Sequence, residues 1–211
     1  MGNLGGDKLV KQTFYNLSPD KKQRIIDAII KEVDGKSFED ISINQIVKNA
    51  EISRGSFYQY FDDKQDIFYV LMHGFTDNLN QVCEKSLEKN NGDLLSAGMD
   101  IFDFILEISK EKNYFVVFKT VFSCVGVNNA FIPSGVKKCK DLTLLNVITE
   151  KVNYSLLNGE EDADIENMVT IICSVIIRSC FDIFVLDMAE QVVKEHLHKM
   201  FLLMKNGFYR R

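Results

Sequence analysis

The side chains with the clearest chemical potential lie in a short segment that begins at Ser53. Ser53 can cap a helix, and the guanidinium of Arg54 can donate two hydrogen bonds to O6 and N7 of a guanine. Gly55 has no side chain in the first helical turn, so another molecule can approach the backbone closely there. Free amides at a helix start also bind phosphate. This combination is typical of a helix that reads the major groove of double-stranded DNA.

A second pattern is the acidic run Asp-Asp-Lys-Gln-Asp at residues 62–66. Some helical enzymes bind magnesium and a diphosphate with this spacing. Such enzymes need a second metal motif on a facing helix, and the sequence contains none. Capping and the helix dipole explain acids at a helix start without any metal. A helical ligand-binding or magnesium-dependent enzymatic bundle without DNA binding is therefore kept as the alternative interpretation.

The remaining motifs give no support to catalysis. Glu195 and His198 have the spacing of half a di-iron site, but that site needs a second copy and two further glutamates. No nucleophile elbow, phosphate-binding loop or zinc pattern occurs in the sequence. We expect no catalytic residue, no metal site and no cofactor, and hence a protein that is not an enzyme.

Short helices must position the segment that begins at Ser53. Ser18 and Pro19 form a strong start for a first helix, and Gly35 suits its end. Ser42 and Gln45 have the spacing of a capping box that opens a second helix. Ser53 begins the third, whose Phe57 and Phe61 share one buried face because they are four residues apart. A tight turn between the second and third helices is the arrangement of a helix-turn-helix.

The composition is that of a folded, largely helical protein. The chain has 211 residues, of which 46% are hydrophobic and 26% charged, and only two prolines interrupt it. Five cysteines without a CxxC pair, together with the lack of a secretory leader, favour the cytoplasm. The apolar stretch from Met168 to Val185 contains Arg178 and Asp182, so we expect no membrane span. The net charge of −5 means that any DNA contact must come from a few placed cations.

The predicted fold class is all-α, with an N-terminal three-helix helix-turn-helix domain and a larger C-terminal helical domain. We expect a flexible N-terminus over residues 1–17, a DNA-binding domain over 18–66 and a ligand-binding and dimerisation domain over 67–211. A fourth helix should run from Asp62 or Asp63 to Lys89. Breaks at glycine, proline and asparagine then predict further helices at roughly 94–110, 114–125, 134–158, 163–187 and 189–206, giving about nine helices in all.

The run of residues 50–61, followed by Lys64, Asp66 and Ile67, resembles the signature of the TetR family of transcriptional regulators. Upstream, Ala28, Gly35, Ile43 and Ile46 fall at that family's spacings. Two positions depart from it, since many relatives have histidine in place of Tyr60 and leucine in place of Phe57. The resemblance and the chemistry above imply that DNA is contacted by Ser42, Asn44, Ser53, Arg54, Gly55, Ser56, Tyr58, Gln59, Tyr60 and Lys64, with Arg54 as the main base reader.

The resemblance also implies a sensor in the rest of the chain. Aromatic residues are concentrated over 94–131, and TetR-type regulators have an apolar pocket between helices there. We expect an unknown apolar or aromatic effector near Phe102, Phe118 or Phe122, which would shift the fourth helix. The family further implies a homodimer through the last two helices, where apolar stripes include Val169, Ile172, Ile176, Val193, Leu197 and Phe201. The predicted function is a repressor that a small ligand releases from a palindromic operator.

Overall fold

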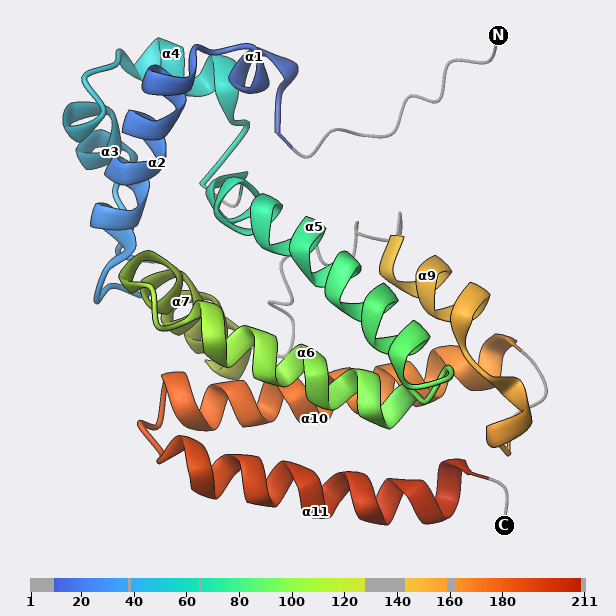
Figure 1. The fold of residues 1–211 in the computed structure, drawn as a ribbon. Helices are drawn as coiled ribbons and strands as arrows, with labels where there is room; N and C mark the ends of the chain where they lie inside the picture. Colours follow the sequence, from blue (N-terminus) through green and yellow to red (C-terminus); the bar gives the residue numbers. More distant parts are fainter. Residues whose placement is uncertain (1–9, 38, 65, 128–142, 159–161, 210–211) are drawn as a thin grey trace, which may run out of the picture.

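The computed structural model describes residues 10–37, 39–64, 66–127, 143–158 and 162–209, and within them every regular element is helical. The all-α prediction is therefore confirmed. Figure 1 shows a head formed by α1 to α4 at one end, α5 leading from it into the body, and α6, α10 and α11 lying along one another. The elements are α1 (Gln12–Tyr15), α2 (Pro19–Val33), α3 (Ile43–Asn49), α4 (Arg54–Tyr60), α5 (Asp66–Lys89), α6 (Leu94–Ile108), α7 (Lys112–Val127), α9 (Thr143–Lys151), the 3-10 turn η1 (Tyr154–Leu156), α10 (Asp162–Phe184) and α11 (Glu190–Phe208).

The helices of the head begin and end close to the predicted residues. Pro19 occupies the first turn of α2, and Gly35 follows its end with a φ of +72°, which glycine adopts without strain. Ser18 lies at the cap position, but its side chain makes no capping hydrogen bond. Ser53 does cap α4, because its Oγ accepts a hydrogen bond of 3.0 Å from the amide of Ser56.

The predicted capping box at the start of α3 is only half formed. The Oγ of Ser42 accepts from the amide of Gln45 at 3.4 Å, as expected. The amide of Ser42, however, donates to the carboxylate of Glu32 at 2.9 Å and not to the side chain of Gln45. A residue of α2 thus completes the cap of α3, which ties the two helices together.

Capping accounts for the acidic run before α5. The Oδ1 of Asp63 accepts from the amide of Asp66 at 3.3 Å, and the Oδ2 of Asp66 accepts from the amide of Asp62 at 2.6 Å. Burial raises the pKa of the Asp66 carboxyl above its usual value. The hydrogen bond that this carboxyl accepts from the Asp62 amide acts in the opposite direction and lowers the pKa. Asp63 and Asp66 therefore each accept a hydrogen bond from a backbone amide of this turn.

Close packing of α6 on the last two helices organises the body. A Cβ at Gly98 would lie 3.0 Å from the Cγ2 of Ile172 in α10 and 3.0 Å from the Cε2 of Phe201 in α11, so a glycine lets α6 approach both. Most members of the two predicted apolar stripes are buried within the protomer: Ile172, Ile176, Val193, Leu197 and Phe201. These side chains form the protomer's own core, and any dimer contact must use other residues of α10 and α11.

The helix predicted over residues 134–158 is longer than the helix that the structure describes there, α9 (Thr143–Lys151). Residues 134–142 lie outside the described residues, and α9 ends at Lys151. The chain then turns against the loop after α5, where the amide of Asn153 donates to the carbonyl of Gly92 at 3.1 Å. Gly92 has a φ of +78°, and a Cβ there would lie 2.3 Å from the nitrogen of Asn153, so only glycine permits this approach.

The N-terminal segment also differs from the expectation of a flexible stretch over 1–17. Residues 12–15 form α1, and both Val10 and Phe14 are buried in the head. The ring of Phe14 packs against Phe61, with centroids 5.3 Å apart. This contact covers part of the head's apolar core and packs residues 10–15 against it.

The buried side chains fall into two clusters, one in the head and one in the body. The head cluster extends beyond residue 66, because it includes Ile67, Val70 and Leu71 of α5 as well as Val116 and Val117 of α7. The first turns of α5 and one face of α7 are therefore structural parts of the head.

Candidate nucleic-acid interface

An exposed polar group spans α3 and α4 at the predicted DNA-reading position. The guanidinium of Arg54 donates from Nη1 to Oδ1 of Asn44 at 2.8 Å and from Nη2 to the hydroxyl of Tyr58 at 3.5 Å. Its Cζ lies 5.9 Å from the centre of the Tyr58 ring, which is a cation–π contact. All three residues are exposed, so the charged group is oriented by its neighbours and still open to solvent.

Four other predicted contact residues lie on or beside the same helix. Ser53, Gly55 and Gln59 are exposed and Ser56 is half-buried. A Cβ at Gly55 would meet nothing nearer than the Oγ of Ser53 at 3.7 Å. The protomer itself therefore does not require glycine at this position, and a requirement imposed by an approaching partner stays a prediction.

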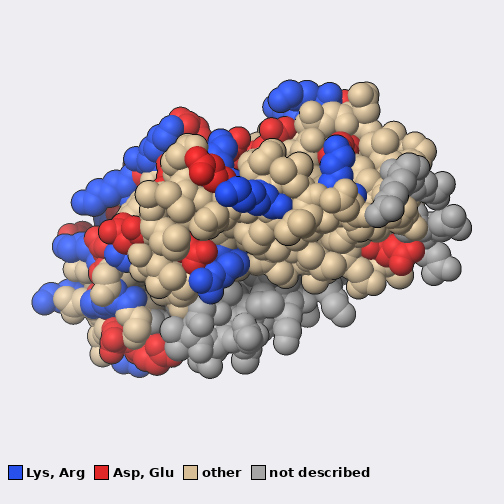
Figure 2. Space-filling view, turned by 90° about the horizontal axis from the view of Figure 1, so that it is seen from below, with Lys and Arg blue, Asp and Glu red and all other residues tan. Residues whose placement is uncertain are grey.

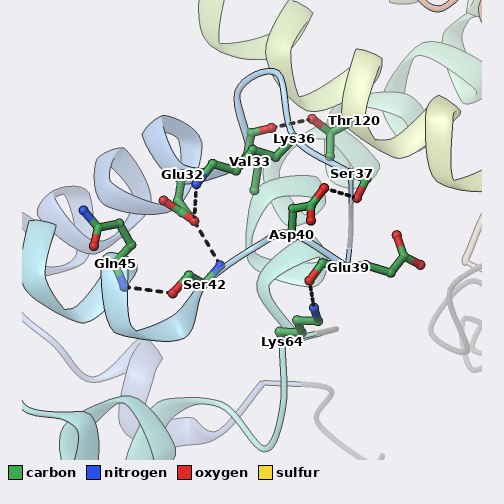
Figure 3. A network of polar contacts seen from close by, with 10 residues as sticks. All are labelled: Glu32, Val33, Lys36, Ser37, Glu39, Asp40, Ser42, Gln45, Lys64 and Thr120. Atoms are coloured by element: carbon green, nitrogen blue, oxygen red, sulfur yellow. Dashed lines mark hydrogen bonds and ion pairs between the residues drawn. The ribbon is translucent and has the colours of Figure 1, made fainter.

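Three predicted contact residues are engaged within the head. The ring of Tyr60 is 5% exposed and packs on Phe14, with centroids 6.3 Å apart. The ring of Tyr60 is thus part of the packing of the head, and a contact of this residue with the DNA backbone stays a prediction. Lys64 donates from Nζ to the carbonyl of Glu39 at 3.0 Å (Figure 3). Ser42 is occupied in capping α3, as described above.

Sequence reasoning missed Glu32, whose carboxylate organises this side of the head. Glu32 is 3% exposed, and its Oε1 accepts from the amide of Ser42 and from Nζ of Lys36, the latter at 2.6 Å (Figure 3). A buried acid needs such partners. The available signal was its place in the sequence, beside Val33 and three residues after Ile29 on the buried face of α2.

The aromatic residues of the body form a contiguous cluster around Phe118. Its ring centroid lies 5.1 Å from that of Phe75, 5.5 Å from Phe184 and 6.1 Å from Phe122, and Phe122 stacks on Phe184 at 5.7 Å. Phe118 is fully buried and Phe122 partly buried. Phe102 is also fully buried, but among the described residues no ring contact joins it to Phe118 or Phe122. Residues 128–131 of the predicted pocket stretch lie outside the described part.

Helix α7 connects this aromatic cluster to the head. Val116 and Val117 on one face are buried in the head cluster, while Phe118 belongs to the body cluster. Between the two faces, the hydroxyl of Thr120 donates to the carbonyl of Val33 at 3.3 Å, at the end of α2 (Figure 3). Helix α7 therefore packs against both the aromatic cluster of the body and the core of the head.

Within the described residues, no group of three or more histidine, cysteine, aspartate or glutamate side chains could hold a metal ion. His198 is exposed on α11, where it lines an open surface groove with Asp100 of α6 and Lys205 of α11. This groove is separate from the aromatic cluster.

The fold and the exposed site define a class of protein, a helix-turn-helix head joined to an all-helical body. The profile of the family described as "Bacterial regulatory proteins, tetR family" matches residues 25–70, and that of the "Tetracyclin repressor-like, C-terminal domain" matches residues 93–208. The second match alone covers more than half of the chain. The protein belongs to the TetR family of bacterial regulators, which is not a family of enzymes.

Curated relatives match less than half of the chain. The "Biofilm operon icaADBC HTH-type negative transcriptional regulator IcaR" of Staphylococcus aureus is 27% identical over 89 residues, 42% of this chain and 48% of that protein. The HTH-type regulator YdgC of Bacillus subtilis is 31% identical over 71 residues, 34% of this chain and 36% of that protein. The chain thus spans about half or less of the curated relatives that it matches.

Solved structures share the fold over nearly the whole chain. A TetR-family regulator from Pectobacterium atrosepticum superposes with a TM-score of 0.58 at 10% identity, covering 93% of this chain and 99% of the other. The multidrug binding protein EbrR, solved in complex with imidazole, gives a TM-score of 0.52 at 14% identity and covers 86% of this chain and 90% of the other. These likenesses support the division into a helix-turn-helix head and a helical body.

Proposed function

We propose that this protein is a sequence-specific DNA-binding transcriptional regulator that represses its target from a palindromic operator. The observation that carries the proposal is the exposed guanidinium of Arg54, held by Asn44 and Tyr58 at the start of α4. An oriented but solvent-open arginine is suited to bidentate recognition of guanine in the major groove. Family membership and the negative regulator IcaR among the relatives support the direction of control.

The DNA contacts fall into two groups. Arg54, Tyr58 and Gln59 are exposed on α4 and are assigned to the bases or to the adjacent backbone. Ser53, Gly55 and Ser56, in the first turn, allow close approach of a phosphate to the backbone. Asn44 of α3 orients Arg54 in the free protein and is assigned to a phosphate in the complex.

Substitution of Arg54 tests this assignment. Arg54→Ala should weaken binding to the selected operator by about 1–3 kcal/mol and relax the base preference at one position of each half-site. Arg54→Lys, the matched control, keeps the charge but not the bidentate geometry, so it should restore non-specific affinity without restoring base preference. Fluorescence anisotropy against a set of single-base operator variants measures both effects. Unchanged selectivity in Arg54→Ala would remove the assignment.

We infer a homodimer through α10 and α11. Both helices bury one side in the protomer but leave apolar side chains in solvent. Figure 2 views the molecule from below and shows many charged side chains at the left end and a broad, largely uncharged area to the right of the centre. The exposed apolar residues of these two helices are Ile171, Ile177, Val192, Leu202 and Leu203. A two-fold axis through this surface would place two heads on one duplex.

The proposed signal is a small apolar or aromatic effector that binds beside the aromatic cluster of the body. Phe118 and Phe122 belong to that cluster, and α7 carries them next to the residues that pack in the head. Movement of α7 and α5 would change the separation of the two heads and so the fit to the operator. The fold relative EbrR, a multidrug binding protein, supports a sensor of this chemistry.

We propose that the protein acts in the cytoplasm and that its described helices do not span a membrane. One described helix, Ala163–Phe184, is long and apolar enough to span a membrane by length and composition. It carries the ion pair of Arg178 with Asp182 at 2.8 Å and packs on α6, α7 and α11. Its apolar character is explained by this packing and by the proposed dimer contact.

A further inference from the structure

The C-terminal end of α4 is covered by residues 10–15, here called the strap. Helix α4 has seven residues, among them glycine and serine, and helices this short are not stable on their own. The last carbonyls of a helix lack partners within it, and each needs a donor from elsewhere. In α4 the carbonyl of Phe57 accepts a hydrogen bond from the amide of Phe61. The carbonyls of residues 58, 59 and 60 then need donors from outside the helix.

The strap supplies a donor to each of these three carbonyls. Nζ of Lys11 donates to the carbonyl of Tyr58 at 2.7 Å, and the amide of Lys11 donates to that of Tyr60 at 3.1 Å. The hydroxyl of Thr13 donates to the carbonyl of Gln59. Lys11 also pairs with Asp62 at 2.6 Å, just beyond the end of α4.

Apolar contacts also hold the strap against the same end of α4. Phe14 is 2% exposed and its ring packs on Tyr60 and Phe61, while Val10 is 1% exposed. The burial of Tyr60 is thus part of the same contact. Lys11 and Thr13 extend over α4 from a segment that is itself anchored in the core of the head.

We propose that the strap is a clamp that holds α4 in its DNA-reading position, with Lys11 and Thr13 as positioning residues. The hydrogen bonds of Lys11 and Thr13 reach the end of α4 opposite to Arg54. The proposal rests on the proposed function for its effect on DNA affinity. Its effect on α4 can be measured without DNA, so the two can fail separately.

Thr13 allows the sharpest test because its hydroxyl makes the contact. Thr13→Val removes the donor at nearly constant shape, and Thr13→Ser keeps it. Amide exchange followed by NMR in the full-length protein should be about five- to tenfold faster for residues 57–61 in Thr13→Val, and close to wild type in Thr13→Ser. The exchange rates of the α10 amides should be unchanged in both variants. Equal exchange of α4 in Thr13→Val and wild type would overturn the clamp.

Substitution of Lys11 tests whether this residue positions α4 or contacts a DNA phosphate directly. Lys11→Met should weaken operator binding about five- to tenfold while leaving the slope of log affinity against log salt unchanged, because no phosphate contact is lost. Lys31→Met, an exposed lysine of α2 that also removes one charge from the head, is the matched control and should bind as wild type. A slope reduced by about 1 in Lys11→Met, with unchanged exchange of α4, would identify Lys11 as a phosphate ligand and overturn its role here.

Discussion

The head and the body differ in what their helices need in order to be stable. The functional helices of the head are short, seven residues each for α3 and α4, and side chains from other segments complete their ends. In the body, α10 has 23 residues and α11 has 19, so most of their backbone hydrogen bonds are internal. Their difficulty lies in the apolar side chains left in water, with Leu203 74% exposed.

This difference shows what each region needs in order to function. The head uses particular polar contacts at its helix ends. Glu32 accepts at the start of α3 and Ser53 at the start of α4, and Lys11 and Thr13 donate at the end of α4. In the proposed dimer, a second copy covers the apolar surface of the body. Substitutions in the head should therefore change how DNA is read, and substitutions on the outer surface of the body should change how many heads are present.

The largest expected effect comes from one buried ring in each region. Phe57→Ala in the head and Phe118→Ala in the body should each lower the free energy of unfolding by about 3–5 kcal/mol, because both rings are almost fully buried. Urea unfolding of both variants measures this. Phe57→Ala should also reduce operator affinity of the folded protein, and by more than Phe118→Ala does, since Phe57 supports α4 directly and Phe118 acts on the head only through α7. If Phe118→Ala reduced it equally, the two regions would not be functionally separable in this way.

The next effect concerns the apolar surface of the body. Leu203→Glu should raise the dimer dissociation constant by at least about tenfold, because burying a leucine contributes about 1.5–3 kcal/mol and a two-fold interface counts the change twice. Sedimentation equilibrium gives the constant. Lys85→Glu, an exposed residue of α5, also changes charge and should remain dimeric. A dimer that is unaffected by Leu203→Glu would place the interface elsewhere.

A smaller effect is expected at Glu32. Glu32→Ala leaves the amide of Ser42 without its acceptor and should cost about 1–3 kcal/mol of stability. Glu32→Gln retains an acceptor for that amide and should cost less. Asp34→Asn removes an acid from an exposed position nearby and serves as the control in urea unfolding. Equal stability of Glu32→Ala and Asp34→Asn would show that the contact contributes nothing.

The smallest effect is a pH dependence at Asp66. Burial raises the pKa of this carboxyl, so the folded head holds its proton more tightly than the unfolded chain does. The ionised form then costs stability above the raised pKa, and the cost disappears as the pH falls through it toward the ordinary value. Asp66→Asn removes this dependence and can still accept from the amide of Asp62. Thermal unfolding between pH 4 and 8 should show wild type gaining stability relative to the variant as the pH is lowered.

The sequence predicted the helices of the head well because their signals are local. Ser42, Ser53 and Gly35 each mark a helix end through contacts within a few residues, and the four-residue spacing of Phe57 and Phe61 defines a face. Tyr60 could have been recognised as inward-facing too, since it lies three residues after Phe57.

Contacts between distant segments could not be predicted in this way. The strap contains only a four-residue helix, too short to show periodicity, and its partners lie 46 and 47 residues away in the chain. The acceptor for the Ser42 amide comes from Glu32, ten residues earlier. In the body, the sequence located α10 and α11 but not their exposed sides, because apolar residues occur around much of α10 and only packing decides which remain in solvent.

The central claim is that α4 inserts Arg54 into the major groove, twice in each dimer. Selection of bound oligonucleotides from a random double-stranded pool tests it most directly, with wild type and Arg54→Ala run in parallel. The account predicts that wild type enriches an inverted repeat containing a guanine in each half-site, and that Arg54→Ala loses the preference for that guanine. Enrichment of no sequence, or of the same guanine by both proteins, would contradict it.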